Sequence, residues 1–147
     1  FTLVELLIVI SIAGIISLLT MGVFSKMADR EALDKQTAIV LSLLNDARAS
    51  TLSAKNAQSF GVHLESGRAV LYVGPTYSAG ATTNKSEIMS GRVSISNISL
   101  SGGGSNVLFD RLTGATSQTG TVTLSLVASP AQTKTITING TGVVSSN

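Results

Sequence analysis

Glu5 carries the only charge among the first 25 residues of this chain. The stretch from residue 6 to residue 24 is apolar apart from the hydroxyls of Ser11, Ser17 and Thr20. A carboxylate near the centre of a membrane helix costs about 2.5–3.5 kcal/mol on insertion scales, so it needs a partner. The chemistry expected of Glu5 is therefore ion pairing, and another copy of the chain could supply the positive group.

Other residues that could do chemistry are few. His63 is the single histidine and the chain has no cysteine, which excludes disulfides and His–Cys or multi-His metal sites. Strand-like alternation around His63 predicts a solvated or hydrogen-bonded side chain. No motif supports a Ser-His-Asp triad, and Glu65, Glu87 and Asp110 are scattered, as surface charges or turn caps are. The sequence predicts no enzyme, no cofactor and no metal site.

The charge distribution also argues against a nucleic-acid-binding protein. Charged residues make up 12% of the chain and the net charge is +2. One of the eight acidic residues is Glu5, so seven remain against ten basic residues in the rest of the chain. These charges are dispersed, whereas a nucleic-acid site clusters Lys and Arg on one face.

The apolar run of residues 6–24 predicts a membrane span. As a helix it is about 28 Å long, close to the ~30 Å hydrocarbon core of a bilayer. No small-residue cleavage site follows it, because the chain becomes charged from Lys26 onward. We expect the segment to stay in the mature chain, and the start at Phe1 in place of Met indicates a trimmed chain or a removed leader.

The helix should continue to about residue 54, since no proline intervenes and an apolar face persists. This face comprises Leu33, Ile39, Val40, Leu43, Leu44 and Ala47. We expect a hydrophobic transmembrane or filament-core helix over residues 1–25 and an amphipathic continuation over residues 26–55. Gly14 and Gly22 are weak helix positions, each costing about 1 kcal/mol relative to Ala. They could allow the helix to kink or melt, or they could allow close helix packing.

Residues 56–147 predict a β-rich globular domain, because the apolar period changes to two. We expect a hairpin at residues 60–73 and a polar loop over residues 74–91. A strand at residues 92–100 needs a β-bulge near Ser96-Asn97 to bring its apolar residues to one face. Further strands are expected at residues 107–109, 121–126, 135–139 and 143–144. The predicted fold class is α+β, with a long N-terminal helix packed on an antiparallel sheet or sandwich of six or seven strands.

The N-terminal segment Phe1-Thr2-Leu3-Val4-Glu5-Leu6-Leu7-Ile8-Val9-Ile10 resembles the mature N-terminus of type IV pilins and pseudopilins. The resemblance implies cleavage before Phe1 by a prepilin peptidase and N-methylation of Phe1. It also implies that Glu5 pairs with the Phe1 amine of a neighbouring subunit during assembly. The family often has proline where this chain has Gly22, so a filament kink there is not dictated.

The second half resembles the minor pseudopilin H and fimbrial T group. The likeness lies in Leu108-Phe109-Asp110 through Gly114, and in the closing segment Thr135-Ile136-Thr137-Ile138-Asn139-Gly140-Thr141-Gly142-Val143-Val144. In that group a β-sandwich-like domain sits on the helix. No acidic residue follows Asp110, so the calcium site of the major type II secretion pseudopilin is not expected.

These features lead to three hypotheses of function. The first is a structural subunit that polymerises through its helix into a helical cell-surface filament. The second is a minor pilin or type II secretion pseudopilin that primes or caps such a filament. The third is a membrane-anchored binding domain.

For the first two, the resemblance implies copies of this chain, other pilins or pseudopilins, prepilin peptidase and an assembly platform as partners. It places the chain in the inner or cytoplasmic membrane before assembly and in an extracellular or periplasmic filament afterwards.

Overall fold

The computed structural model describes residues 2–53 and 57–147, with residues 18–24 described by their backbone alone. The chain divides into two compact units, Phe1–Glu31 and Ala32–Asn147. The first unit is helical throughout its described part from Leu3 onward. The second unit contains the rest of the helix and all the described strands.

Helix α1 runs without interruption from Leu3 to Leu52. This confirms the prediction of one continuous helix ending near residue 54. Within the second unit its buried apolar side chains are Leu33, Val40, Leu43, Leu44 and Ala47. Ile39, which was predicted to share this buried face, is only half-buried.

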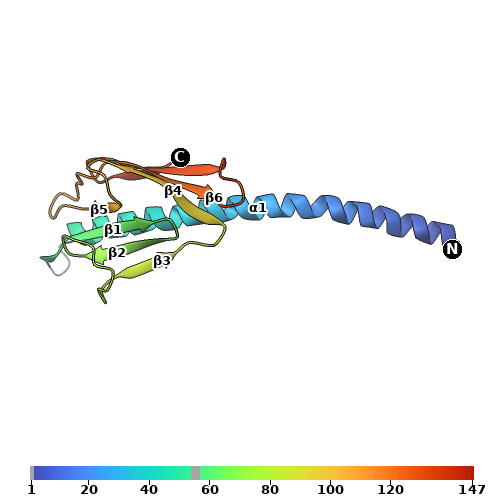
Figure 1. Ribbon diagram of the computed structural model, residues 1–147, viewed down its shortest axis with the longest axis horizontal. Coiled ribbons are helices and arrows are strands. Elements are labelled where there is room, and N and C mark those ends of the chain that lie inside the picture. The colour runs from blue at the N-terminus through green and yellow to red at the C-terminus, as the bar shows by residue number, and fades with distance from the viewer. Residues whose placement is uncertain (1, 54–56) are drawn as a thin grey trace. The chain divides into compact units, whose positions relative to one another are not determined.

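The strands form two four-stranded antiparallel sheets (Figure 1). The first has the order β3-β2-β1-β5 and the second the order β4-β6-β7-β8. Their bounds are β1 Phe60–Glu65, β2 Arg68–Val73, β3 Lys85–Ile88, β4 Val93–Leu100, β5 Asn106–Leu108, β6 Gly120–Leu126, β7 Thr133–Ile138 and β8 Val144–Ser146. The predicted α+β class is therefore confirmed, with a helix packed on two antiparallel sheets.

One apolar core joins the second unit's part of α1 to both sheets. Several strands, such as β4 and β7, contribute alternate residues, because successive side chains of a strand point to opposite faces. The largest fully buried members from the strands and the turn after β5 include Val62, Leu64, Val107, Phe109, Val122, Leu124, Leu126, Ile136 and Ile138. The part of α1 in the second unit therefore shares one hydrophobic core with both sheets.

Two predictions about the strands need correction. The polar loop expected over residues 74–91 contains β3, which pairs with β2. The described part of the chain therefore has eight strands, where six or seven were predicted. β3 consists of Lys85-Ser86-Glu87-Ile88, which has no alternating apolar pattern. β3 forms because it pairs with β2, so a search for alternating apolar residues could not predict this strand.

The predicted β-bulge in the strand after residue 92 is confirmed. The register between β4 and β6 shifts between Ile95 and Asn97. The extra residue, Ser96, donates its hydroxyl to the carbonyl of Thr123 at 3.2 Å. A bulge inserts one residue, which restores the parity of the apolar residues that follow.

Thr51 ties the end of α1 to the start of β1. Its side chain is fully buried. The hydroxyl donates to the carbonyl of Ala47 at 2.9 Å and accepts the backbone N–H of Phe60 at 3.0 Å. This hydroxyl is therefore the partner of a buried backbone donor at the strand entrance.

We expect Thr51→Val to destabilise the second unit by about 1–3 kcal/mol, the cost of a buried donor left unpaired. Valine preserves the shape of the side chain and removes the oxygen that accepts the Phe60 N–H. Urea unfolding of the full chain in detergent, followed by far-UV circular dichroism, measures the change. Thr51→Ser keeps the hydroxyl and should retain most of the stability. Equal losses from both variants would mean that the missing methyl contacts, and not the hydrogen bond, are responsible.

Candidate functional site

Glu5 closes a capping box at the start of α1. The Glu5 N–H donates to the Thr2 hydroxyl at 3.3 Å, and the Thr2 N–H donates to Glu5 Oε2 at 3.3 Å. Such a reciprocal pair satisfies two of the backbone donors that a helix N-terminus leaves free. The other carboxylate oxygen, Oε1, accepts no hydrogen bond from any described residue. It is available to a partner.

The sequence interpretation of Glu5 missed this local role. The signal was present, because a threonine followed three residues later by a glutamate at the start of an apolar helix is a capping-box pattern. Capping and ion pairing use different oxygens of one carboxylate, so both roles can coexist. Any test of Glu5 must therefore separate its charge from its hydrogen bond.

The helix around Glu5 is apolar on every side. Ten large apolar side chains between residues 3 and 16 are each at least 50% exposed. They are Leu3, Val4, Leu6, Leu7, Ile8, Val9, Ile10, Ile12, Ile15 and Ile16. Soluble monomers rarely expose a continuous apolar surface of this size, so it marks contact with lipid or with another protein.

The hydroxyl groups of this segment bond to their own helix. Ser11 donates to the carbonyl of Leu7 at 2.7 Å, and Ser17 donates to the carbonyl of Ala13 at 2.8 Å. Side chains bonded in this way to the preceding turn need no water. The Glu5 carboxylate is therefore the polar group of residues 3–17 that most needs an outside partner.

The other predicted site residues are Phe1, Gly14 and Gly22. Phe1 lies outside the described residues, and so do the surroundings of Gly22, whose backbone is helical. Gly14 is also helical, and no atom lies within 4 Å of the place where its Cβ would be. Since α1 is unbroken at both glycines, a kink or melted segment in a filament stays a prediction.

No helix among the described residues has the length and hydropathy needed to span a membrane. Within the same residues, no group of three or more His, Asp or Glu side chains is placed to hold a metal ion.

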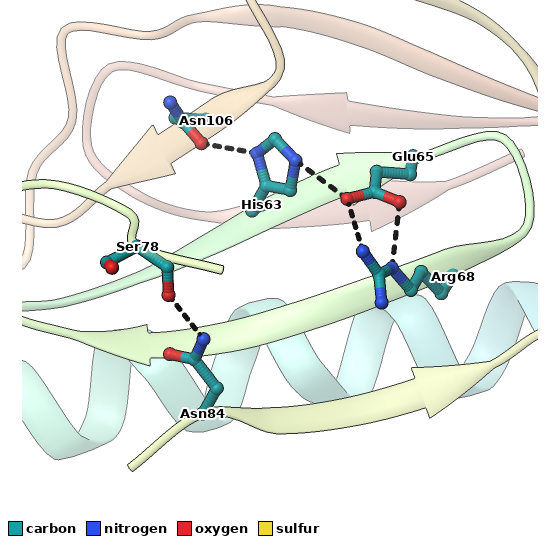
Figure 2. A network of polar contacts seen from close by, with 6 residues as sticks. All are labelled: His63, Glu65, Arg68, Ser78, Asn84 and Asn106. Atoms are coloured by element: carbon teal, nitrogen blue, oxygen red, sulfur yellow. Dashed lines mark hydrogen bonds and ion pairs between the residues drawn. The ribbon is translucent and has the colours of Figure 1, made fainter. Parts of the chain in front are cut away.

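A polar network centred on His63 covers the sheet face opposite the core (Figure 2). His63 Nδ1 lies 2.6 Å from Asn106 Oδ1, and its Nε2 lies 3.2 Å from Glu65 Oε1. Arg68 donates to both oxygens of Glu65, at 2.7 and 2.9 Å. The ring of Tyr77 stacks on His63 with centroids 3.9 Å apart. The predicted hydrogen-bonded role of His63 is confirmed, and the network fixes the loop before β3 to the sheet.

We expect the network to loosen in acid. The hydrogen bond from Arg68 lowers the pKa of Glu65 below its ordinary value. A carboxyl with a lowered pKa contributes stability above its unfolded pKa and loses it as the pH falls through the lowered value. NMR should show the signals of the Glu65 carboxyl and the Arg68 Nε–H shifting together as Glu65 is protonated in that acidic range. In Arg68→Gln, the Glu65 carboxyl should titrate at a higher pH, and an unchanged midpoint would contradict the assignment.

Comparisons of the chain with protein-family models, with curated proteins and with solved structures give no significant match.

Proposed function

We propose that this chain is a type IV pilin-like structural subunit that polymerises through its N-terminal helix into a helical cell-surface filament. The observation that carries the proposal is a Glu5 carboxylate oxygen that no described residue bonds, on the helical segment of residues 3–16, whose ten large apolar side chains are exposed. A helix that serves only as a membrane anchor gains nothing from a charge that is costly to bury. A helix that must bind a neighbouring helix can use the charge, because a buried carboxylate is tolerated when it is paired.

The physical sequence of assembly follows from the same surface. Before assembly, lipid would cover the apolar side chains of residues 3–16 in the inner or cytoplasmic membrane. In the filament, helices of neighbouring copies would replace the lipid around them, and close packing between helices together with polar contacts such as that of Glu5 would drive the exchange. Glu5 would pair with the Phe1 amine of the adjacent copy. Head-to-tail contacts that do not close into a ring produce an open helical fibre, in an extracellular or periplasmic location.

The resemblance stated above supplies the remaining partners. They are a prepilin peptidase that cuts before Phe1, an inner-membrane assembly platform, and other pilins or pseudopilins. Two four-stranded sheets on one helix agree with the sandwich expected for the minor pseudopilin H and fimbrial T group. This agreement favours a second candidate function within the same family, a low-abundance subunit that primes or caps the filament.

Electron microscopy of filaments sheared from cells, with mass spectrometry of their subunits, tests the proposal. If this chain is the main component and carries a methylated Phe1, it is the major subunit. If it is present in trace amounts, it is a minor pilin or pseudopilin. If filaments never contain this chain, and Glu5 variants reach the membrane in wild-type amounts, a membrane-anchored binding domain explains the chain better than a filament subunit.

A further inference from the structure

A groove runs between α1 and the sheet of β1, β2 and β3 in the second unit. Its volume is about 530 Å³. Buried Phe60 and half-buried Leu71 and Val73 line it, while exposed Asp46 and Lys85 lie at its rim. β3, which carries Lys85, is the edge strand of its sheet (Figure 1). An apolar lining with a few charged groups at the rim is typical of a surface that accepts an inserted side chain.

A turn elsewhere in the same unit presents a side chain suited to such a groove. Leu112 is 84% exposed and has φ = +75°. A bulky residue in the left-handed region is a backbone outlier. Glycine or asparagine at the same position would adopt this conformation with less strain. The Gly114 N–H donates to the carbonyl of Asp110 at 2.9 Å and holds the turn closed. The chain thus maintains a strained conformation that places a large apolar side chain in solvent.

The charges beside Leu112 complement those of the groove. Asp110 and Arg111 precede Leu112, and the groove rim carries Asp46 and Lys85. Among the described residues, the side chains of Asp46, Asp110 and Arg111 form no ion pair. Lys85 has one, to Glu87 at 3.3 Å on its own strand. With Leu112 inserted, Arg111 can face Asp46 while Asp110 faces Lys85.

We infer that Leu112 of one copy of this chain inserts into the groove between α1 and β3 of the next copy. The inference rests on the proposed filament and names the contact between neighbouring β-domains. The turn and the groove are different surfaces, so the contact is head-to-tail. Each copy keeps one of the two surfaces free to bind a further copy. A contact of this kind repeats along an open fibre.

Cysteine cross-linking of assembled filaments tests the contact, because the chain has no native cysteine. With a short bis-maleimide, Leu112→Cys combined with Ala49→Cys or Thr83→Cys should give a ladder of covalent multimers. Each single variant alone should give none, and filaments that mix Leu112→Cys with Ala49→Cys chains should stop at dimers. Leu112→Cys with Thr123→Cys is the matched control, since Thr123 lies on β6 of the other sheet.

Two further variants separate an interface role from a folding role. Leu112→Gly relieves the left-handed strain, so it should raise the midpoint temperature of thermal unfolding. It should also lower the cross-linking yield at least tenfold, measured in chains that carry Ala49→Cys and Thr113→Cys. Arg111→Asp should weaken the ladder, and adding Asp46→Arg should restore it. A purely structural turn would show no such rescue.

The outcomes distinguish this inference from the proposed function. Filaments that contain the chain but give no ladder from either groove position overturn the Leu112 contact and leave the filament function standing. A ladder from the Thr123 control also overturns it. Absence of the chain from every filament removes the proposed function and this contact together. A ladder specific to the groove positions, with rescue by Asp46→Arg, supports both.

Discussion

Glu5→Gln should lower incorporation of the chain into filaments about 100-fold or more while leaving the start of α1 intact. Glutamine can replace glutamate in a capping box, so the bond from the Thr2 N–H survives. The charge is lost, and in the proposed filament the Phe1 amine of the neighbouring copy would be left buried without a counter-ion. Stranding one member of a buried pair costs about 3–5 kcal/mol, and each 1.4 kcal/mol is tenfold in an equilibrium. The ratio of sheared-filament to membrane-bound protein measures the effect.

Thr2→Ala is the matched control for this prediction. It removes the hydroxyl that accepts the Glu5 N–H and leaves the carboxylate unchanged. The loss of a helix N-cap costs about 1 kcal/mol, so incorporation should fall less than tenfold. Glu5→Ala and Glu5→Val remove the charge and the cap together and should resemble Glu5→Gln. If Thr2→Ala and Glu5→Gln were equally defective, helix capping would explain the role of Glu5 and ion pairing would not.

The elements found from sequence are those whose signal is local. Apolar periodicity without proline was enough to extend α1 across both units and to identify its buried apolar residues apart from Ile39, which is half-buried. The β4 bulge followed from parity, because Ile98 and Leu100 share the buried side with Ile95 only if a residue is inserted. β3 has no such pattern of its own. Its strand conformation comes from pairing with β2, which a reading of residues 85–88 alone cannot predict.

The candidate site shows the same division. Glu5 was identified because a single charge in an apolar segment is informative wherever the chain folds. The groove could not be predicted, since its rim residues Asp46 and Lys85 are far apart in sequence and meet only through the packing of α1 on the sheet. Leu112 looked like an ordinary turn residue, because nothing in Asp110-Arg111-Leu112-Thr113-Gly114 reveals the sign of φ. Its backbone conformation is fixed by the turn that encloses it.

Gly142→Ala should destabilise the second unit by about 3 kcal/mol or more, among the larger effects expected of a single methyl group. Gly142 has φ = +76°, and a Cβ there would collide with the carbonyl oxygen of Gly114. It would also lie 2.9 Å from Arg48 Nε. Arg48 donates to that same carbonyl at 3.2 Å and to the Thr141 carbonyl at 3.3 Å, which ties α1 to both turns. The methyl group would therefore strain the backbone and disturb these bonds together. Urea unfolding of the full chain in detergent measures the loss.

Gly140→Ala is the matched control, because it adds the same methyl group two residues away in the same turn. A Cβ at residue 140 meets Thr119 Cγ2 at 3.5 Å, an ordinary van der Waals contact. The backbone of Gly140 is outside the left-handed region, so this variant should unfold within about 1 kcal/mol of wild type. Equal losses from the two variants would mean that general stiffness of the turn matters. A loss confined to Gly142→Ala would mean that stability depends on the close approach to Gly114 that lets Arg48 bridge the two turns.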